Sequence, residues 1–188
     1  MKKIMFGVFV VSIFLFTQSA FAATATAIVS GTSVEGPAVT GEVTLVEMND
    51  GLDIMVTLYG VPPGKHGFHI HENGSCAEAG SAAGGHYNPD GVVHGLVVKD
   101  GNEHAHAGDF GNIEIDGQGN GSLHFFIPKL TLSGEKYNVS GRAVILHEKE
   151  DDFGQPTGNA GGRIGCGLIV IDEPEAEMMM DEAESLGE

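Results

Sequence analysis

Basic side chains are scarce in this sequence. Lysine and arginine together number nine among 188 residues, against 26 aspartates and glutamates, and the formal net charge at pH 7 is −17. A protein that binds nucleic acid through its phosphates needs a basic face, and nine basic side chains in so acidic a chain do not supply one. We therefore exclude nucleic acid as a partner.

Long apolar runs are also missing, except near the N-terminus. Residues 1–22, MKKIMFGVFVVSIFLFTQSAFA, contain two lysines, then an apolar run over 4–16, then Ala-Phe-Ala. This order is typical of a signal peptide, and the apolar run is too short to span a bilayer comfortably. We expect a signal peptide at 1–22, an exported mature chain that begins near Ala23, and no membrane anchor after cleavage.

The last residues are acidic throughout. Residues 172–188, DEPEAEMMMDEAESLGE, carry eight acidic side chains and no lysine or arginine, which favours a disordered, solvated extension. The methionines at 178–180 are soft ligands that suit copper(I), although an isolated methionine triplet is more often incidental. The sequence thus predicts one domain at 23–171 and an acidic disordered tail at 172–188.

Cysteine is limited to Cys76 and Cys166. Exported compartments are oxidising, so this even pair predicts one disulfide. Closing a loop of about 90 residues would contribute about 4 kcal/mol in the chain-entropy description. The bond would tie the segment after His71 to the last strand. Free or metal-bound thiols are the alternative.

Helical periodicity is nearly absent, and short alternating or β-branched runs take its place. Strands are predicted at 42–48, 52–59, 112–115, 122–127, 142–147 and 167–171. Together with 29 glycines, this pattern predicts an all-β fold, a Greek-key sandwich or barrel of about eight antiparallel strands. Residues 73–93 and 148–163 do not fit the strand rhythm, and long loops in a compact domain are commonly functional.

Histidine is abundant, with nine residues. In HGFHIHENGSC, residues 66–76, His69 and His71 are two apart in an extended segment, so both rings point to one face. An isolated H-x-H pair is usually two solvated histidines, but four more histidines fall at strand ends or in the first long loop and its continuation: His86, His94, His106 and His147. Imidazoles suit copper and zinc, and histidines with one carboxylate, here Asp109, suit zinc in particular.

Five stretches resemble, in order, the signatures of the copper/zinc superoxide dismutase family. They are GFHIHE, GGHYNP, HAGDFGN, GRAVILHEKEDD and GNAGGRIGCG, and they span nearly all of residues 25–171. The resemblance implies an antioxidant oxidoreductase that disproportionates superoxide to dioxygen and hydrogen peroxide outside the cytoplasm. It implies copper and zinc as cofactors and superoxide as the substrate.

The resemblance also implies two overlapping sets of metal ligands. The copper ligands would be His69, His71, His86 and His147. The zinc ligands would be His86, His94, His106 and Asp109. His86 would therefore join the redox-active copper to a structural zinc. His104 is a competitor of His106, but only His106 has the family's H-x-x-D spacing to Asp109.

Two more residues match family positions near the metals. Arg163 in GNAGGR matches the arginine beside copper, where a fixed cation attracts and orients superoxide, and it is the predicted catalytic residue. An arginine that merely caps the loop is the alternative. Asp151 matches the carboxylate that links a copper histidine to a zinc histidine, with Asp152 as a competitor. His66 and His124 are predicted to be surface or packing residues.

The chain departs from the family pattern in its second long loop. Between HEKEDDFG and TGNAGGR it has only Gln155 and Pro156, and the charges that guide superoxide in animal enzymes are missing, so we expect altered or weaker steering. The short lysine-rich leader and the closeness of Cys76 to His71 favour a bacterial-like, periplasmic protein, whereas HEKEDDFG is similar to eukaryotic members of the family, and the extracellular space is the alternative. A homodimer is compatible with the resemblance, whose members assemble through different faces.

Two other functions remain open on the same motifs. A non-catalytic metal buffer or copper donor is suggested by the methionine triplet, and it would not need Arg163. A copper-only relative would lack zinc ligands, and His94, His106 and Asp109 argue against it.

Overall fold

The computed structural model describes residues 22–173, so nearly all of the expected signal peptide and tail, including the methionine triplet, lie outside the described residues. The nine strands of the described part are β1 Thr24–Gly31, β2 Thr40–Glu47, β3 Gly51–Tyr59, β4 Gly64–His71, β5 Asp109–Ile115, β6 Gly121–Pro128, β7 Ala143–His147, β8 Arg163–Leu168 and β9 Val170–Ile171. Helix is limited there to η1, Ser81–Ala83, and α1, Val97–Asp100. None of the helices in this part is long and apolar enough to cross a membrane.

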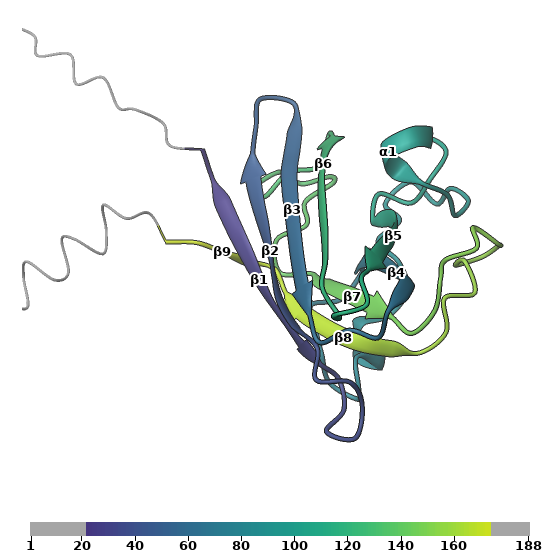
Figure 1. The fold of residues 1–188 in the computed structure, drawn as a ribbon. Helices are drawn as coiled ribbons and strands as arrows, with labels where there is room; N and C mark the ends of the chain where they lie inside the picture. Colours follow the sequence, from purple (N-terminus) through teal and green to yellow (C-terminus); the bar gives the residue numbers. More distant parts are fainter. Residues whose placement is uncertain (1–21, 174–188) are drawn as a thin grey trace, which may run out of the picture.

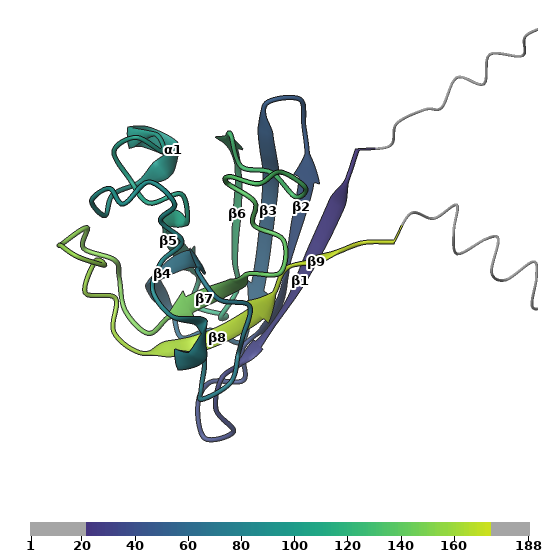
Figure 2. The ribbon, with the colours of Figure 1, turned by 180° about the vertical axis from the view of Figure 1, so that it is seen from behind.

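The strands form one antiparallel sheet in the order β5-β4-β7-β8-β1-β2-β3-β6, with β9 paired to β1. β5 and β6, the two ends of this path, lie against each other, so the sheet curls into a nearly closed barrel (Figures 1 and 2). Because β3 pairs with β6 and β4 with β7, the connections are those of a Greek key. The predicted all-β fold of about eight antiparallel strands is confirmed.

Alternation along β4 places the first two histidines of interest. Phe68 and Ile70 are fully buried members of the hydrophobic core. Successive side chains of a strand point to opposite faces, so His69 and His71 point away from this core. Their rings meet the two long connections, 72–108 and 148–162, because His71 bonds to the Gly84 carbonyl and His69 to the Asp151 carboxylate.

Two strands differ from the sequence prediction. β1 was not among the predicted runs, because its inward side chains are small ones, such as Ala25 and Ala27, and give a weak hydrophobic signal. The run predicted at 167–171 is instead split at Ile169, which pairs with backbone of the segment before β7 and interrupts the ladder. β8, the strand before this split, begins at Arg163 and not at the predicted residue 167. Gly165 and Gly167 allow its neighbouring strands to approach closely.

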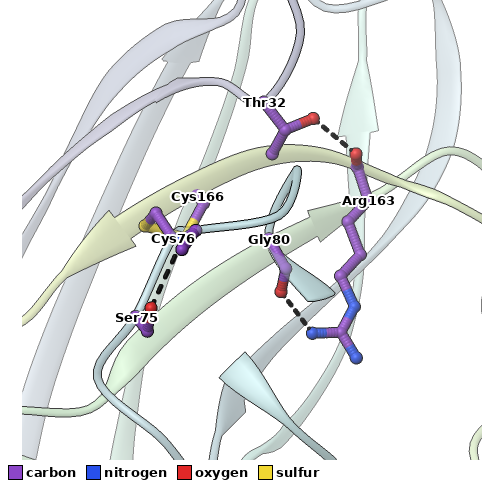
Figure 3. Close-up of a disulfide and its surroundings, with 7 residues drawn as sticks. Thr32, Ser75, Cys76, Gly80, Arg163 and Cys166 are labelled. Atoms are coloured by element: carbon purple, nitrogen blue, oxygen red, sulfur yellow. Dashed lines mark hydrogen bonds between the residues drawn. A yellow bond between two sulfur atoms is a disulfide. The ribbon is translucent and has the colours of Figure 1, made fainter. Parts of the chain in front are cut away.

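The predicted disulfide between Cys76 and Cys166 is confirmed. Its Cα atoms are 5.8 Å apart and the two cysteines are separated by 90 residues in the sequence. Cys166 lies in β8 and Cys76 in the first long connection (Figure 3). The bond therefore fastens that connection to the barrel wall.

Candidate metal centre

Four buried histidines gather beside β4 and β7. The ligand atoms of this group all lie within 4.8 Å of one another, and the group, which we call the four-histidine cluster, comprises His69, His71, His86 and His147. Strand register brings the members together, because His69 pairs with Ile145 in β7, two residues before His147. An isolated bridge between His71 and His86 adds the member from the loop.

The ring nitrogens of His71 and His147 face each other. Nδ1 of His71 donates to the Gly84 carbonyl at 3.0 Å and Nδ1 of His147 donates to the Gly161 carbonyl at 3.5 Å. Since a carbonyl oxygen only accepts, these Nδ1 atoms carry the protons and both Nε2 atoms present lone pairs. The two Nε2 atoms are only 3.3 Å apart. Two facing lone pairs repel each other, which a cation between them relieves.

His69 offers a further unused lone pair. Its Nε2 donates to Oδ2 of Asp151 at 2.9 Å, while its Nδ1 is buried and has no hydrogen-bond partner within the described residues. A buried polar atom without a partner costs about 1–3 kcal/mol. The orphaned nitrogen and the facing lone pairs of His71 and His147 fit a bound transition metal, and an all-imidazole set suits copper.

Burial keeps three rings of this cluster neutral, those of His69, His71 and His147. It lowers the pKa of His69 to about 4, of His147 to about 3 and of His71 to about 2. For His71 and His147 the charges of neighbouring histidines and of Arg163 act in the same direction. Metals bind the unprotonated imidazole, so these rings are ready for a metal at neutral pH without losing a proton.

A second group of ligands surrounds one carboxylate. We call it the Asp109 cluster, and its buried members are His86, His94, His106 and Asp109. Oδ1 of Asp109 accepts from Nδ1 of His86 at 2.8 Å and from Nδ1 of His106 at 3.1 Å, and Oδ2 accepts from Nδ1 of His94 at 2.8 Å. Three imidazoles and one carboxylate form the donor set that suits zinc, so the residues present fit this metal.

The Asp109 carboxylate stays ionised although it is fully buried. Burial alone would raise its pKa, but hydrogen bonds from the three histidines and from the Gly95 backbone hold the pKa well below the usual range. The His94 ring shows the reverse effect. Burial would lower its pKa, but hydrogen bonds to Asp109 and Asp151 together raise it to about 9.

Asp151 joins the two clusters. Its carboxylate accepts from Nε2 of His69 at 2.9 Å and from Nε2 of His94 at 3.0 Å. Burial would raise the pKa of Asp151, but these bonds lower it. The trio of His69, His94 and Asp151 also gathers ligand atoms, yet both ring nitrogens act as donors to the carboxylate, so we interpret it as a link. Asp152 accepts only from Gly154 and Asn159 within its own loop.

Sequence reasoning missed a residue that holds Asp151. Asn112 of β5 donates from its side-chain amide to the Asp151 carbonyl at 2.8 Å, and its side-chain oxygen accepts from the Asp151 backbone N–H at 2.7 Å. The sequence signal was an asparagine in a predicted strand, which strands disfavour.

The remaining three histidines belong to neither cluster. His104 is exposed, whereas His106 is buried. His66 packs with both ring nitrogens on the carbonyls of His147 and Pro62. His124 is exposed on β6 and bonds to Asp53.

Arg163 is held by the first long connection. Its guanidinium donates to the carbonyls of Gly80 and Gly84, each at 2.5 Å, and its own carbonyl accepts from Thr32 at 2.6 Å (Figure 3 shows the Gly80 and Thr32 bonds). The Gly84 carbonyl also accepts from His71, so one carbonyl orients both side chains. The Cys76–Cys166 disulfide lies beside this arrangement and fixes the loop that supplies it.

Comparisons with known proteins agree on one family. A family model described as copper/zinc superoxide dismutase matches residues 39–169. An extracellular Cu-Zn superoxide dismutase of Drosophila melanogaster is 42% identical over 144 residues, 71% of this chain and 76% of that one. An extracellular Cu-Zn superoxide dismutase of Haemonchus contortus is 41% identical over 135 residues, 68% of each chain.

A solved structure shares the fold. The crystal structure titled as that of the clock protein EA4 is 33% identical and superposes with a TM-score of 0.70, over 84% of this chain and all of that one. Both histidine clusters lie inside the region that the family model matches. The chain therefore belongs to the copper/zinc superoxide dismutase family.

Proposed function

We propose that this chain is a superoxide dismutase with copper in the four-histidine cluster, zinc in the Asp109 cluster, and the ring of His86 shared between them. The observation that carries the proposal is that His86 is common to both clusters. Its Nδ1 faces Asp109, which leaves Nε2 for the four-histidine cluster. The family membership and the names of the relatives support the same activity.

The reaction converts two superoxide ions and two protons to one dioxygen and one hydrogen peroxide. Copper supplies the one-electron chemistry when bound, because it alternates between two oxidation states, whereas zinc has no redox chemistry and holds the geometry. The protein must then attract the anion, orient it and deliver protons. These tasks fall to side chains of the chain itself.

Arg163 attracts and orients the anion in this proposal. Its guanidinium keeps its positive charge, and two carbonyls fix its position beside His71 and His147. A preorganised cation binds a small anion without further reorganisation. The net charge of −17 does not prevent capture, because distant charges are screened over about 8 Å at physiological ionic strength and the local field dominates.

His86 and Asp151 manage protons and orientation. Nε2 of His86 faces the four-histidine cluster, a position from which an imidazole can act as a general acid toward the reduced product. Asp151 accepts from both His69 and His94, so it fixes the orientation of one ring in each cluster.

We further propose that the protein is exported and protects the space outside the cytoplasm from superoxide. The predicted signal peptide supports export, and the two relatives are named extracellular. The bacterial-like and periplasmic assignment and the homodimer stay predictions from the sequence.

The test is to purify the mature chain, load it with copper and zinc, and measure superoxide removal together with the stoichiometry of each metal. We expect one copper and one zinc per chain and rapid removal of superoxide. Full occupancy without activity would identify a metal buffer instead, and binding of a single metal would refute the shared histidine.

A further inference from the structure

His94 lies in a stretch without regular secondary structure. It falls between η1 and α1, outside every strand, yet the residue is only 3% exposed. Its ring is held at both nitrogens, by Asp109 and by Asp151. A strand would fix the backbone of such a residue through ladder hydrogen bonds. For His94 another group must supply those bonds.

The side-chain amide of Gln155 supplies them. The His94 backbone N–H donates to Oε1 of Gln155 at 3.0 Å, and Nε2 of Gln155 donates to the His94 carbonyl at 2.9 Å. The two residues are 61 positions apart in the sequence. Two bonds between the same pair fix both position and direction, as a pair of ladder bonds does in an antiparallel sheet.

The loop that carries Gln155 is ordered by its own hydrogen bonds. The Asp152 N–H donates to the Gly158 carbonyl at 2.9 Å, and the Gly158 N–H donates to the Gly154 carbonyl at 2.7 Å. The loop also passes directly against the metal ligands. A Cβ atom on Gly158 would lie 1.8 Å from Oδ1 of Asp151 and 2.7 Å from Nε2 of His94. Gln155 is thus presented from a preformed turn.

Phe153 of the same loop covers the His94 ring. The two rings are stacked at an interplanar angle of 20°, with centroids 6.3 Å apart, and Phe153 is 43% exposed. Its backbone N–H donates to Oδ1 of Asp151 at 2.8 Å. Asp151, Phe153 and Gln155 therefore contact three different parts of His94 from five consecutive residues of the loop.

We propose that Gln155 is a positioning residue for His94 and that its amide slows the release of zinc from the Asp109 cluster. This inference rests on the proposed assignment of zinc to that cluster. The short second loop presents Gln155 to His94 and so gives the zinc site a clamp on the backbone of one of its ligands. Copper in the four-histidine cluster does not depend on the clamp, because Gln155 bonds to none of its residues.

The connection 72–108, which carries His94, contains a second pair of side-chain amide bonds, and it provides a comparison. Asn88 donates to the Val92 carbonyl at 2.9 Å and accepts from the Val92 N–H at 3.1 Å. That clamp closes a local turn within one connection. The Gln155 clamp joins two connections, so it restrains how far His94 can move away from Asp151.

The experiment compares Gln155→Met, which keeps the side-chain length but removes donor and acceptor, with Gln155→Glu, which keeps only the acceptor for the His94 N–H. Gln118→Met is the matched control, because Gln118 is exposed on the turn between β5 and β6. The chain loaded with copper and zinc is challenged with a chelator, and the release of each metal is followed. Cobalt(II) placed in the zinc site gives a visible spectrum that reports ligand geometry.

We expect Gln155→Met to release zinc roughly 10-fold to 100-fold faster than the parent chain, the range seen when a group that orients a metal ligand is removed. Gln155→Glu should release zinc at a rate between those of the parent chain and Gln155→Met. Copper should leave every variant at the parent rate, and the cobalt spectrum should change in Gln155→Met only. Unchanged zinc release in Gln155→Met, or equal acceleration for both metals, would overturn the inference and leave the proposed function standing. A parent chain that takes up no zinc would overturn both.

Discussion

The two clusters share His86 but are built on different kinds of backbone. In the four-histidine cluster, His69, His71 and His147 come from β4 and β7, whose register is set by the barrel. In the Asp109 cluster, all three histidines come from the connection between β4 and β5, and only the carboxylate begins a strand. The first arrangement is fixed by sheet pairing, whereas the second is held by side-chain hydrogen bonds to Asp109.

The electrostatics of the two clusters differ in the same way. Burial lowers the pKa of the strand-borne histidines, and two carboxylates raise the pKa of His94. The four-histidine cluster therefore presents neutral lone pairs, whereas the Asp109 cluster is built around a charged carboxylate at the start of β5.

The largest effect is expected from pH in the metal-free protein. The pKa values of His69, His71 and His147, about 4, 2 and 3, lie below the ordinary 6.5, so their stabilisation is present above pH 6.5 and is lost as pH falls. For each ring the free energy of unfolding falls by about 1.4 kcal/mol per pH unit of acidification below pH 6.5, and for the three rings together by about 4 kcal/mol per unit. The His94 pKa of about 9 has the opposite sign, so its stabilisation is present below pH 6.5 and is lost as pH rises through 9.

Urea unfolding of the chelator-treated chain on both sides of pH 6.5 measures these two slopes. His94→Gln should remove the alkaline loss and leave the acid loss in place. A free energy of unfolding that does not change with pH below 6.5 would contradict the assignment of neutral rings to the four-histidine cluster.

Reversal of the charge at Arg163 should act on activity alone. Arg163→Glu is expected to lower the rate of superoxide removal by about 100-fold, because a preorganised cation is replaced by an anion. Copper and zinc contents should stay near those of the parent chain, since Arg163 bonds to carbonyls and to no ring nitrogen. Arg163→Lys, which keeps the charge, is the control. A matching loss of copper would show that Arg163 is structural.

Asp151→Asn should weaken both clusters at once. The side chain of asparagine has one acceptor oxygen and one donor nitrogen, so it cannot accept from the Nε2 donors of His69 and His94 through two oxygens as the carboxylate does. We therefore expect the affinity for each metal to fall roughly 10-fold to 100-fold. Asp152→Asn is the matched control, because Asp152 bonds only within its loop. Calorimetric titration of each metal makes the comparison, and loss of one metal only would refute the link.

The smallest effect is expected at His104. The side chain is exposed, so His104→Ala should change the free energy of unfolding by less than about 0.5 kcal/mol and leave zinc retention unaltered. His106→Ala should lose zinc. Zinc analysis of the two purified variants decides between them, and equal losses would mean that His104 also serves the Asp109 cluster.

Part of this architecture could be predicted from residue patterns. The alternation FHIH is enough to place Phe68 in the core and His69 on the opposite face, because a strand has a period of two. The even cysteine count in an exported chain likewise predicted the disulfide. The approach of His69 to His147 followed only from the family resemblance, since the 77 intervening positions carry no signal of which strands pair.

The contacts that orient the ligands could not be predicted from spacing. Gln155 was merely what remained of a short loop, and Asn112 a residue in a strand. Each acts through a side chain that bonds to the backbone of a residue far away in the sequence, and such bonds depend on how distant segments meet in space. β1 and β8 were harder to recognise for a related reason: small residues and glycines pack closely there but give little hydrophobic periodicity.

The central claim is that one imidazole serves both clusters, and the metal content of His86→Ala tests it most directly. His71→Ala and His106→Ala, each confined to one cluster, are the references. Each variant is supplied with equal amounts of copper and zinc, and the excess is removed. We expect His71→Ala to lose copper, His106→Ala to lose zinc, and His86→Ala to lose both metals. Normal retention of either metal by His86→Ala would contradict the account.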